Sequence, residues 1–235
     1  MCGRASLSQV EKQLEVRFKA SFFPKVSTVA VLPNYNIAPT QLHPVITNQE
    51  PEHLQYFRWG LIPFWAKEAS IGSRMINARI ETISEKPAFR QAIQKRRCLV
   101  PLDGFYEWKK RGKEKIPYRI VLKEEQIFCV AGIWETWQPP NGPVIHSFSI
   151  LTQPPNELMR DIHNRMPAIL FPEQESLWID RDIPTKDVLA AIQPFPSELM
   201  KAFRVSKRVN KVGENDVDLL KEVDAPLPPE QGRLF

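Results

Sequence analysis

Cysteine, histidine and glycine are all scarce in this chain of 235 residues, and each scarcity excludes a class of protein. The three cysteines include no CxxC pair, so neither a disulfide framework nor a zinc ribbon is expected, and the thiols should be reduced. The four histidines show no HxxxH spacing, so neither a metal site nor a cofactor is predicted. Only 9 glycines stand against 22 prolines, which favours fixed turns and edge strands over long helices because proline lacks a backbone donor.

Long apolar runs are absent as well. No stretch of 18 apolar residues occurs, and charged residues such as Glu11, Lys12 and Glu15 interrupt the first 20 positions, so the sequence predicts neither a membrane span nor a signal peptide. A cytoplasmic protein is therefore expected. The net charge of +5 is compatible with a polyanionic partner, although many proteins of this charge have none.

Strand-like patterns dominate the middle of the chain. Short runs rich in β-branched and aromatic residues begin at residues 43, 53, 97, 105, 117, 127, 144 and 166. Because only short turns separate them, they predict a single α+β domain with a largely antiparallel, barrel-like β core. The domain is expected over residues 2–222, and the proline-rich segment 223–235 is expected to be a flexible tail.

Helical patterns lie at the periphery of this predicted sheet. Ser8 and Glu11 have the spacing of a capping box, which predicts a helix with Val10, Leu14 and Phe18 on its apolar face. Further helices are expected over residues 85–97, 173–179, 186–192 and 196–203.

Two stretches carry polar residues at alternate positions. In "MINARIET", Asn77, Arg79 and Glu81 would share one face of a strand, which indicates either a binding partner or a solvated edge strand. In "DIHNRMP", His163 and Arg165 alternate in the same way before an apolar run. His163 is a candidate proton shuttle, although a lone histidine more often has a structural role.

Aromatic residues accompany the remaining candidates. Glu107 lies between Tyr106 and Trp108, and a carboxylate among aromatics tends to have a raised pKa, which suits a general acid; pairing with Lys109 is the structural alternative. Aromatics also alternate with cations in "FRWGLIPFWAK" and after Trp108, a pattern that suits base stacking and phosphate neutralisation. Trp65 and Trp108 could act there or lie in the core, whereas Trp134 and Trp178 are expected in the core.

The chain begins with "MCGR". If Met1 is removed, Cys2 presents an α-amine and a thiol on one residue, and both are nucleophiles near neutral pH. The alternative is that Cys2 is an incidental small residue at a frayed terminus.

These motifs occur together in a recognisable order. With "MCGR", the stretches "YNIAPTQ", "RWGLIPFWAK", "INARIET", "RCLVPLDGFYEWK", "AGIWE" and "DIHNRMP" resemble the SOS-response-associated peptidase (SRAP) family, from residue 2 to about residue 220. The resemblance implies a protein that senses abasic sites in single-stranded DNA and links itself to them covalently. It also implies a single α+β domain, in keeping with the strand pattern.

The resemblance further implies a lyase-type chemistry and the residues that perform it. The α-amine of Cys2 adds to the aldehyde of the open abasic sugar, and its thiol closes a thiazolidine ring. Glu107 would assist opening of the sugar, His163 would transfer protons, and Asn77 would hydrogen bond the adduct. Family members are also credited with autoproteolytic removal of the first methionine.

The predicted DNA contacts come from the same resemblance. Arg4, Arg79 and Arg165 would contact phosphates, and Asn36 and Pro39 would line the pocket. Lys86, Trp65 and Trp108 would lie near the strand. The expected partner is single-stranded DNA containing abasic sites, bound by a monomer that associates with the nucleoid.

Two other functions remain open from the sequence. An N-terminal-nucleophile peptidase would use Cys2 to attack an amide but would have no need of the arginines, and it requires an oxyanion hole. A noncatalytic DNA-binding or adaptor module would leave Cys2 inert, so that alanine at this position would change nothing.

Overall fold

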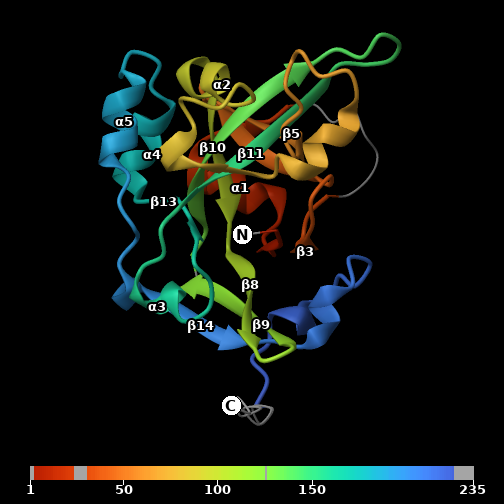
Figure 1. Ribbon diagram of the computed structural model, residues 1–235, viewed down its shortest axis with the longest axis vertical. Helices are drawn as coiled ribbons and strands as arrows, with labels where there is room; N and C mark the ends of the chain where they lie inside the picture. The colour runs from red at the N-terminus through yellow and green to blue at the C-terminus, as the bar shows by residue number, and fades with distance from the viewer. Residues whose placement is uncertain (1–2, 24–30, 125, 225–235) are drawn as a thin grey trace, which may run out of the picture.

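The computed structural model describes residues 3–23, 31–124 and 126–224, and it contains two β-sheets flanked by short helices (Figure 1). The smaller sheet has five antiparallel strands. In spatial order they are β14 (Met200–Arg204), β9 (Glu114–Leu122), β8 (Gly104–Arg111), β1 (Ala5–Leu7) and β3 (Asn34–Ile37).

The larger sheet closes on itself. Its strands in order are β12 (Met166–Pro167), β11 (Ile145–Gln153), β10 (Phe128–Trp137), β7 (Arg97–Leu102), β4 (Leu42–Thr47), β5 (His53–Trp59) and β2 (Ser21–Phe22), with β13 (Ile169–Leu170) on β10 and β6 (Asn77–Arg79) on β11. Because β11 also pairs with β5, the path from β11 through β10, β7, β4 and β5 forms a closed barrel. Most pairings are antiparallel, and the parallel ones join β11 to β5 and β6, and β5 to β2. The predicted barrel-like core is thus confirmed.

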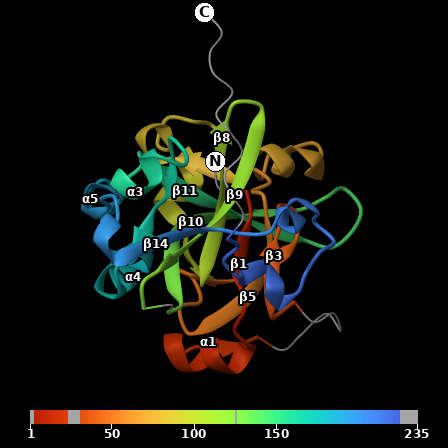
Figure 2. The same ribbon diagram turned by 90° about the horizontal axis from the view of Figure 1, so that it is seen from below.

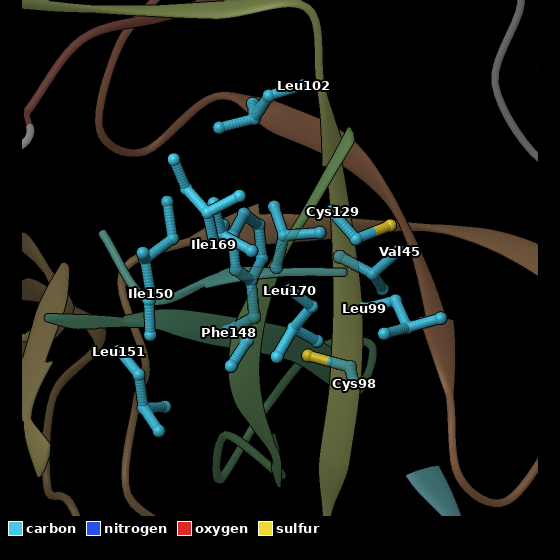
Figure 3. Close-up of a cluster of buried hydrophobic side chains, with 14 of the residues drawn as sticks. Val45, Cys98, Leu99, Leu102, Cys129, Phe148, Ile150, Leu151, Ile169 and Leu170 are labelled. Atoms are coloured by element: carbon cyan, nitrogen blue, oxygen red, sulfur yellow. The ribbon is translucent and has the colours of Figure 1, made fainter. Parts of the chain in front are cut away.

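Apolar side chains from these strands fill the space that the barrel encloses. Figure 3 shows part of a cluster of buried apolar side chains that includes Val45 from β4, Leu99 from β7 and Phe148 from β11, each at most 4% exposed. The thiols of Cys98 and Cys129 belong to the same cluster, and burial raises the pKa of both. Trp134 and Trp178 are 5% and 1% exposed, which confirms their predicted place in the core.

Short helices cover the outside of the sheets. They are α1 (Glu11–Phe18), α2 (Arg90–Lys95), α3 (Glu157–Arg160), α4 (Pro172–Ile179) and α5 (Thr185–Ala191), with 3-10 turns η1 (Ala69–Arg74), η2 (Ile80–Thr82), η3 (Ser197–Leu199), η4 (Lys207–Asn210) and η5 (Val217–Leu220). Helices α4 and α5 lie together on one flank, and α1 lies on the side opposite the turn between β8 and β9 (Figure 2). Within the described ranges, no helix has the length and apolarity to cross a bilayer.

Three helix predictions are wrong in detail, and the helix expected over residues 85–97 is confined to α2, which starts only at Arg90. Val10, and not Ser8, precedes the first helical residue of α1, and the Gln13 side chain accepts the Val10 N–H at 2.9 Å. Ser8 does not cap the helix, because its backbone N–H and its hydroxyl both donate to the Asp103 carboxylate. The predicted helix over 196–203 is instead η3 followed by strand β14, because pairing with β9 outweighs the local preference.

Asp103 also fixes the corner at which β7 continues into β8. Its carboxylate accepts from Ser6 Oγ at 2.6 Å and pairs with Arg119 at 3.1 Å. A Cβ at position 104 would lie 2.9 Å from Arg119 Nε, so a larger residue there would displace the Arg119 side chain that pairs with Asp103. This corner aims β8, which carries Glu107, away from the barrel.

Candidate functional site

Predicted site residues meet near the turn between β8 and β9. A cavity of about 370 Å³ lies there, and we call it the Glu107 cavity. Its lining residues are Glu107, Trp108, Lys110, Lys115, His163 and Asn210. The structure therefore brings Glu107, Trp108 and His163 together, although the last is 55 residues or more from the others in the chain.

Glu107 is the buried acid of this cavity. It is 2% exposed, and burial raises the pKa of its carboxyl above the ordinary value. The preceding residue, Tyr106, is held by its hydroxyl, which donates to the Tyr35 carbonyl at 2.7 Å. A carboxyl group that keeps its proton closer to neutral pH can donate that proton in a reaction, as a general acid does.

His163 faces the same cavity with a defined tautomer. The backbone N–H of Arg165 donates to His163 Nδ1 at 3.1 Å, so the proton of the neutral ring lies on Nε2. Burial lowers the pKa of His163, and the positive charge of Lys110 acts in the same direction. A neutral imidazole near pH 7 can both accept and donate a proton, which agrees with the predicted shuttle role.

Arg165, a predicted phosphate contact, is engaged within the chain. Its Nη1 and Nη2 atoms donate to the two Glu81 carboxylate oxygens at 2.5 and 2.9 Å, and Nη2 also donates to the Thr152 carbonyl. The Arg165 side chain is 12% exposed, whereas that of Glu81 is 42% exposed. Hydrogen bonding to Arg165 lowers the pKa of Glu81, which keeps this carboxylate ionised.

A second and larger cavity contains the other group of predicted residues. It measures about 570 Å³, and we call it the Asn77 cavity. Its lining residues are Trp65, Met75, Asn77, Arg79, Thr82, Lys86, Pro87, Ala88 and Phe89. Asn77 and Arg79 alternate along β6 as predicted, but Glu81 lies beyond the strand, in η2. Four of the predicted residues, Trp65, Asn77, Arg79 and Lys86, therefore share this cavity.

Trp65 reaches the Asn77 cavity from an exposed loop and is 49% exposed. A close backbone contact fixes the loop, since a Cβ at Gly60 would lie 2.5 Å from the Gly72 carbonyl oxygen and the φ of Gly60 is +122°. Trp108 is half-buried, and its indole N–H donates to Asn210 Oδ1 at 2.8 Å. Both tryptophans thus reach the surface, as one of the two sequence alternatives requires.

Arg4 and Asn36 line neither cavity and instead brace the chain behind the Glu107 cavity. Arg4 is 9% exposed, and its guanidinium donates to Asn36 Oδ1 at 2.7 Å and to the Val209 carbonyl. Asn36 Nδ2 donates to the Lys211 and Glu214 carbonyls at 3.0 and 2.8 Å. Pro39 is half-buried in the turn after β3. The predicted DNA contacts of all three residues stay predictions.

Lys115 and Asn210 line the Glu107 cavity but were not predicted from the sequence. Lys115 lies opposite Lys110 in the β8–β9 hairpin. If the two strands had been predicted to form a hairpin in this register, Lys115 would have been expected beside Lys110. Asn210 is the last residue of η4 and lies about 100 residues after Trp108 in the chain. No local sequence pattern predicts that it lines this cavity.

Cys2 lies outside the described residues. Nearby, the backbone N–H of Tyr106 donates to the Arg4 carbonyl at 2.9 Å, so the described chain starts beside the strand that carries Glu107. Among the described residues, no group of three or more histidine, cysteine, aspartate or glutamate side chains could hold a metal ion.

Comparison with known proteins identifies the family of the chain. A family model described as SOS response associated peptidase (SRAP) matches residues 1–212. The chain belongs to this family. The SRAP chain is 42% identical over 225 residues to abasic site processing protein YoqW of Bacillus subtilis, covering 94% of this chain and 99% of that protein. It is 30% identical over 224 residues to abasic site processing protein HMCES of Xenopus tropicalis, covering 81% and 66%.

Solved structures share the fold of this SRAP chain. A crystal structure of a Bacteroides thetaiotaomicron protein superposes with a TM-score of 0.86 at 33% identity, covering 94% of this chain and all of the other. A Bordetella bronchiseptica protein gives a TM-score of 0.75 at 25% identity, covering 87% of this chain and all of the other. The architecture is thus that of a known single α+β domain.

Proposed function

We propose that this SRAP chain shields abasic sites in single-stranded DNA by forming a covalent thiazolidine crosslink through Cys2 after loss of Met1. The observation that carries the proposal is the Glu107 cavity, where a buried acid and a neutral histidine lie among cations. Curated relatives named abasic site processing proteins support the substrate class.

The position of Arg4 supports Cys2 as the nucleophile. Two residues of chain span at most about 7 Å, and the Arg4 carbonyl is hydrogen bonded to Tyr106, the neighbour of Glu107. The proposal therefore requires Cys2 to reach the Glu107 cavity within this span. Removal of Met1, by autoproteolysis or otherwise, is a required first step, because only a free α-amine can form an imine.

The chemistry starts with the closed abasic sugar. Glu107 protonates the ring oxygen while the C1′ hydroxyl proton passes to water, which breaks the ring C–O bond and gives the aldehyde. Glu107 then regains a proton from solvent. The neutral amine of Cys2 adds to C1′, and loss of one water gives an imine. The Cys2 sulfur then bonds to C1′ while its proton passes to the imine nitrogen. The product is a five-membered thiazolidine, and the net change is loss of one water.

His163 and Asn77 are assigned the remaining polar roles. The Nε2–H of His163 and its basic form are both available near pH 7, so His163 can move protons during imine formation and exchange. Asn77, which lines the other cavity, is assigned the hydrogen bond to the closed adduct.

The strand is proposed to lie across both cavities. Arg79 and Lys86 are exposed at the Asn77 cavity, and Lys110 and Lys115 are exposed at the Glu107 cavity. Trp65 and Trp108 offer stacking surfaces at the two ends. Contacts of Arg4, Asn36, Pro39 and Arg165 with DNA belong to the same proposal. We propose that the domain of residues 2–222 acts as a cytoplasmic monomer that joins the nucleoid when it binds DNA.

The competing function is an N-terminal-nucleophile peptidase, and the family description names a peptidase. It shares Cys2 with the crosslinking reaction, but it gives no role to the cations that line both cavities. The two functions differ in product, since only crosslinking raises the mass of the chain by that of the DNA minus one water.

Intact-mass spectrometry with a single-stranded abasic oligonucleotide tests the proposal. Wild-type chain should start at Cys2 and form a heat-stable adduct. Cys2→Ala should give no stable adduct but a borohydride-trappable imine, because its α-amine survives, and Cys2→Ser should behave similarly because an oxazolidine opens more readily. A stable adduct from Cys2→Ala would rule out the thiazolidine, and cleavage of a peptide without any adduct would favour the peptidase.

A further inference from the structure

Glu81 has no role in the function proposed so far, yet its carboxylate occupies a guanidinium expected to hold a DNA phosphate. Both Glu81 oxygens accept from Arg165. Arginine also binds a phosphate group in this way, through two parallel hydrogen bonds from two guanidinium nitrogens to two oxygens. The carboxylate and a phosphate would therefore compete for the same face of Arg165.

The Glu81–Arg165 pair lies between the two cavities. Arg165 donates to the Thr152 carbonyl, and Thr152 is paired with Arg79 of the Asn77 cavity in the β6–β11 ladder. The backbone N–H of Arg165 donates to His163 of the Glu107 cavity. A strand that crosses from one cavity to the other would therefore pass this pair.

The two partners differ in how easily they could be exchanged. Arg165 is mostly covered and is anchored to β11 by Thr152, whereas Glu81 is 42% exposed on the 3-10 turn η2. Exposed ion pairs contribute little stability, so the Glu81 carboxylate can move away at small cost while the guanidinium stays in place.

Resting on the proposed function, we propose that Glu81 is a specificity-determining residue that masks Arg165 against the phosphates of intact single-stranded DNA. The mask lowers the affinity for an undamaged strand, because a phosphate must displace the Glu81 carboxylate from Arg165 and is repelled by its negative charge. A strand held by its abasic sugar in the Glu107 cavity has a phosphate at high local concentration beside Arg165, and displaces the mask there.

Binding of an intact single-stranded oligonucleotide tests this inference. Glu81→Gln should bind about two- to fivefold more tightly than wild type, the factor that corresponds to an exposed ion pair. Its log–log salt slope should be steeper by about 0.7, as expected for one added phosphate contact on a single strand. The matched control is Glu222→Gln, which removes a carboxylate with 54% exposure and a Lys201 partner at 3.3 Å, and should leave both quantities unchanged.

A double-mutant cycle assigns the gain to Arg165. In an Arg165→Gln background, Glu81→Gln should give no tighter binding, and thermal unfolding of each variant checks that the fold is kept. Unchanged or weaker binding by a folded Glu81→Gln chain would overturn the inference, as would a gain that persists without Arg165. The DNA carries no aldehyde, so this outcome is independent of whether Cys2 forms a crosslink, which the abasic oligonucleotide tests separately.

Discussion

At the scale of single residues, burial shifts the two groups of the Glu107 cavity toward neutrality from opposite directions. It raises the pKa of Glu107, which favours the protonated acid, and lowers the pKa of His163, which favours the neutral base. Desolvation disfavours whichever form carries charge, so one physical cause produces both shifts. The cavity therefore holds a proton donor and a proton acceptor over the same range of pH.

Replacement of Glu107 by glutamine should separate ring opening from the later steps. Glu107→Gln keeps the size and can donate a hydrogen bond but cannot transfer a proton. We expect it to slow adduct formation on a closed abasic sugar by about 10²- to 10⁴-fold, the usual loss for a missing general acid. Single-turnover rates from quenched gels measure the effect.

A ring-free aldehyde in the same DNA context provides the control, because it bypasses ring opening. Glu107→Gln should react with it nearly as fast as wild type, whereas His163→Ala should remain slow on both substrates. Equal slowing of Glu107→Gln on both would show that Glu107 positions the DNA or tunes Cys2, and that its assignment to ring opening is wrong.

The same assignment has a pH dependence with a definite sign. The acid form of Glu107 is present below its raised pKa and is lost as pH rises through it, so the wild-type rate should fall on that limb. The free α-amine, with a reference pKa of about 7.7–8.0, contributes the opposite trend. In Glu107→Gln the descending limb should disappear, which a pH–rate profile on the closed sugar detects.

These residues are recognisable in the sequence only to the extent that the residues that define their surroundings are close to them in the chain. The aromatic context of Glu107 and the alternation of Asn77 and Arg79 are visible in short stretches, and both residue sets line cavities. The Glu81–Arg165 pair joins segments 84 residues apart, and no local pattern contains it. Predicting that Arg165 is already occupied therefore required the tertiary structure.

At the scale of elements, the segment after η4 depends on one amide. Asn36 in β3 donates to the carbonyls of Lys211 and Glu214 while its oxygen accepts from Arg4. This arrangement needs a donor on one side of the side chain and an acceptor on the other, which only an amide supplies at this size. Asn36 thereby holds the loop that places Asn210 against Trp108.

Asn36→Asp should loosen this loop although it preserves shape. The substitution keeps the side-chain oxygen that accepts from Arg4. It replaces the NH₂ group, which donates to the Lys211 and Glu214 carbonyls, by a second oxygen that cannot donate to them. Leaving buried groups without partners costs about 1–3 kcal/mol, so the unfolding free energy should drop by about that amount. Amide hydrogen exchange should accelerate in residues 209–215 while it stays slow in the barrel strands.

Asn34→Asp serves as the matched control. Asn34 is on the same strand, and its side-chain oxygen accepts from the Asn36 N–H at 3.0 Å, a contact that aspartate preserves. Faster exchange confined to residues 209–215 in Asn36→Asp and absent from Asn34→Asp is expected. Equal exchange in both variants would contradict the bracing role.

The elements that sequence predicted best are those with strong periodicity. The strands between residues 97 and 153 are predicted correctly, because β-branched and aromatic runs are long there. The helix over 196–203 failed because its pattern fits a helix locally, whereas the open edge of β9 recruits residues 200–204 as a strand. Closure of the barrel by β11 on β5 was not predictable in detail, since it joins strands about 90 residues apart.

At the scale of the whole molecule, the positive charge is distributed in a way that the net charge of +5 does not convey. Arg4 and Arg165, two of the arginines predicted to meet phosphates, are engaged inside the chain. The exposed cations at the site are instead Arg79 and Lys86 at one cavity and Lys110 and Lys115 at the other. The two cavities therefore present similar charge to a strand.

The salt dependence of single-strand binding should report whether DNA occupies both cavities. Each phosphate contact on a single strand contributes about −0.7 to the slope of log affinity against log salt, so four cations give about −3 and one cavity alone gives about −1.4. The three arginines predicted from sequence would give about −2. Lys86→Gln and Lys115→Gln, one at each cavity, should each make the slope shallower by about 0.7. Lys12→Gln is the control and should leave the slope unchanged. Lys12 is 80% exposed, but it belongs to α1, which lies on the side opposite the turn between β8 and β9 (Figure 2). If only one of the two cavity variants changes the slope, the strand runs through that cavity alone, and the proposed path across both is wrong.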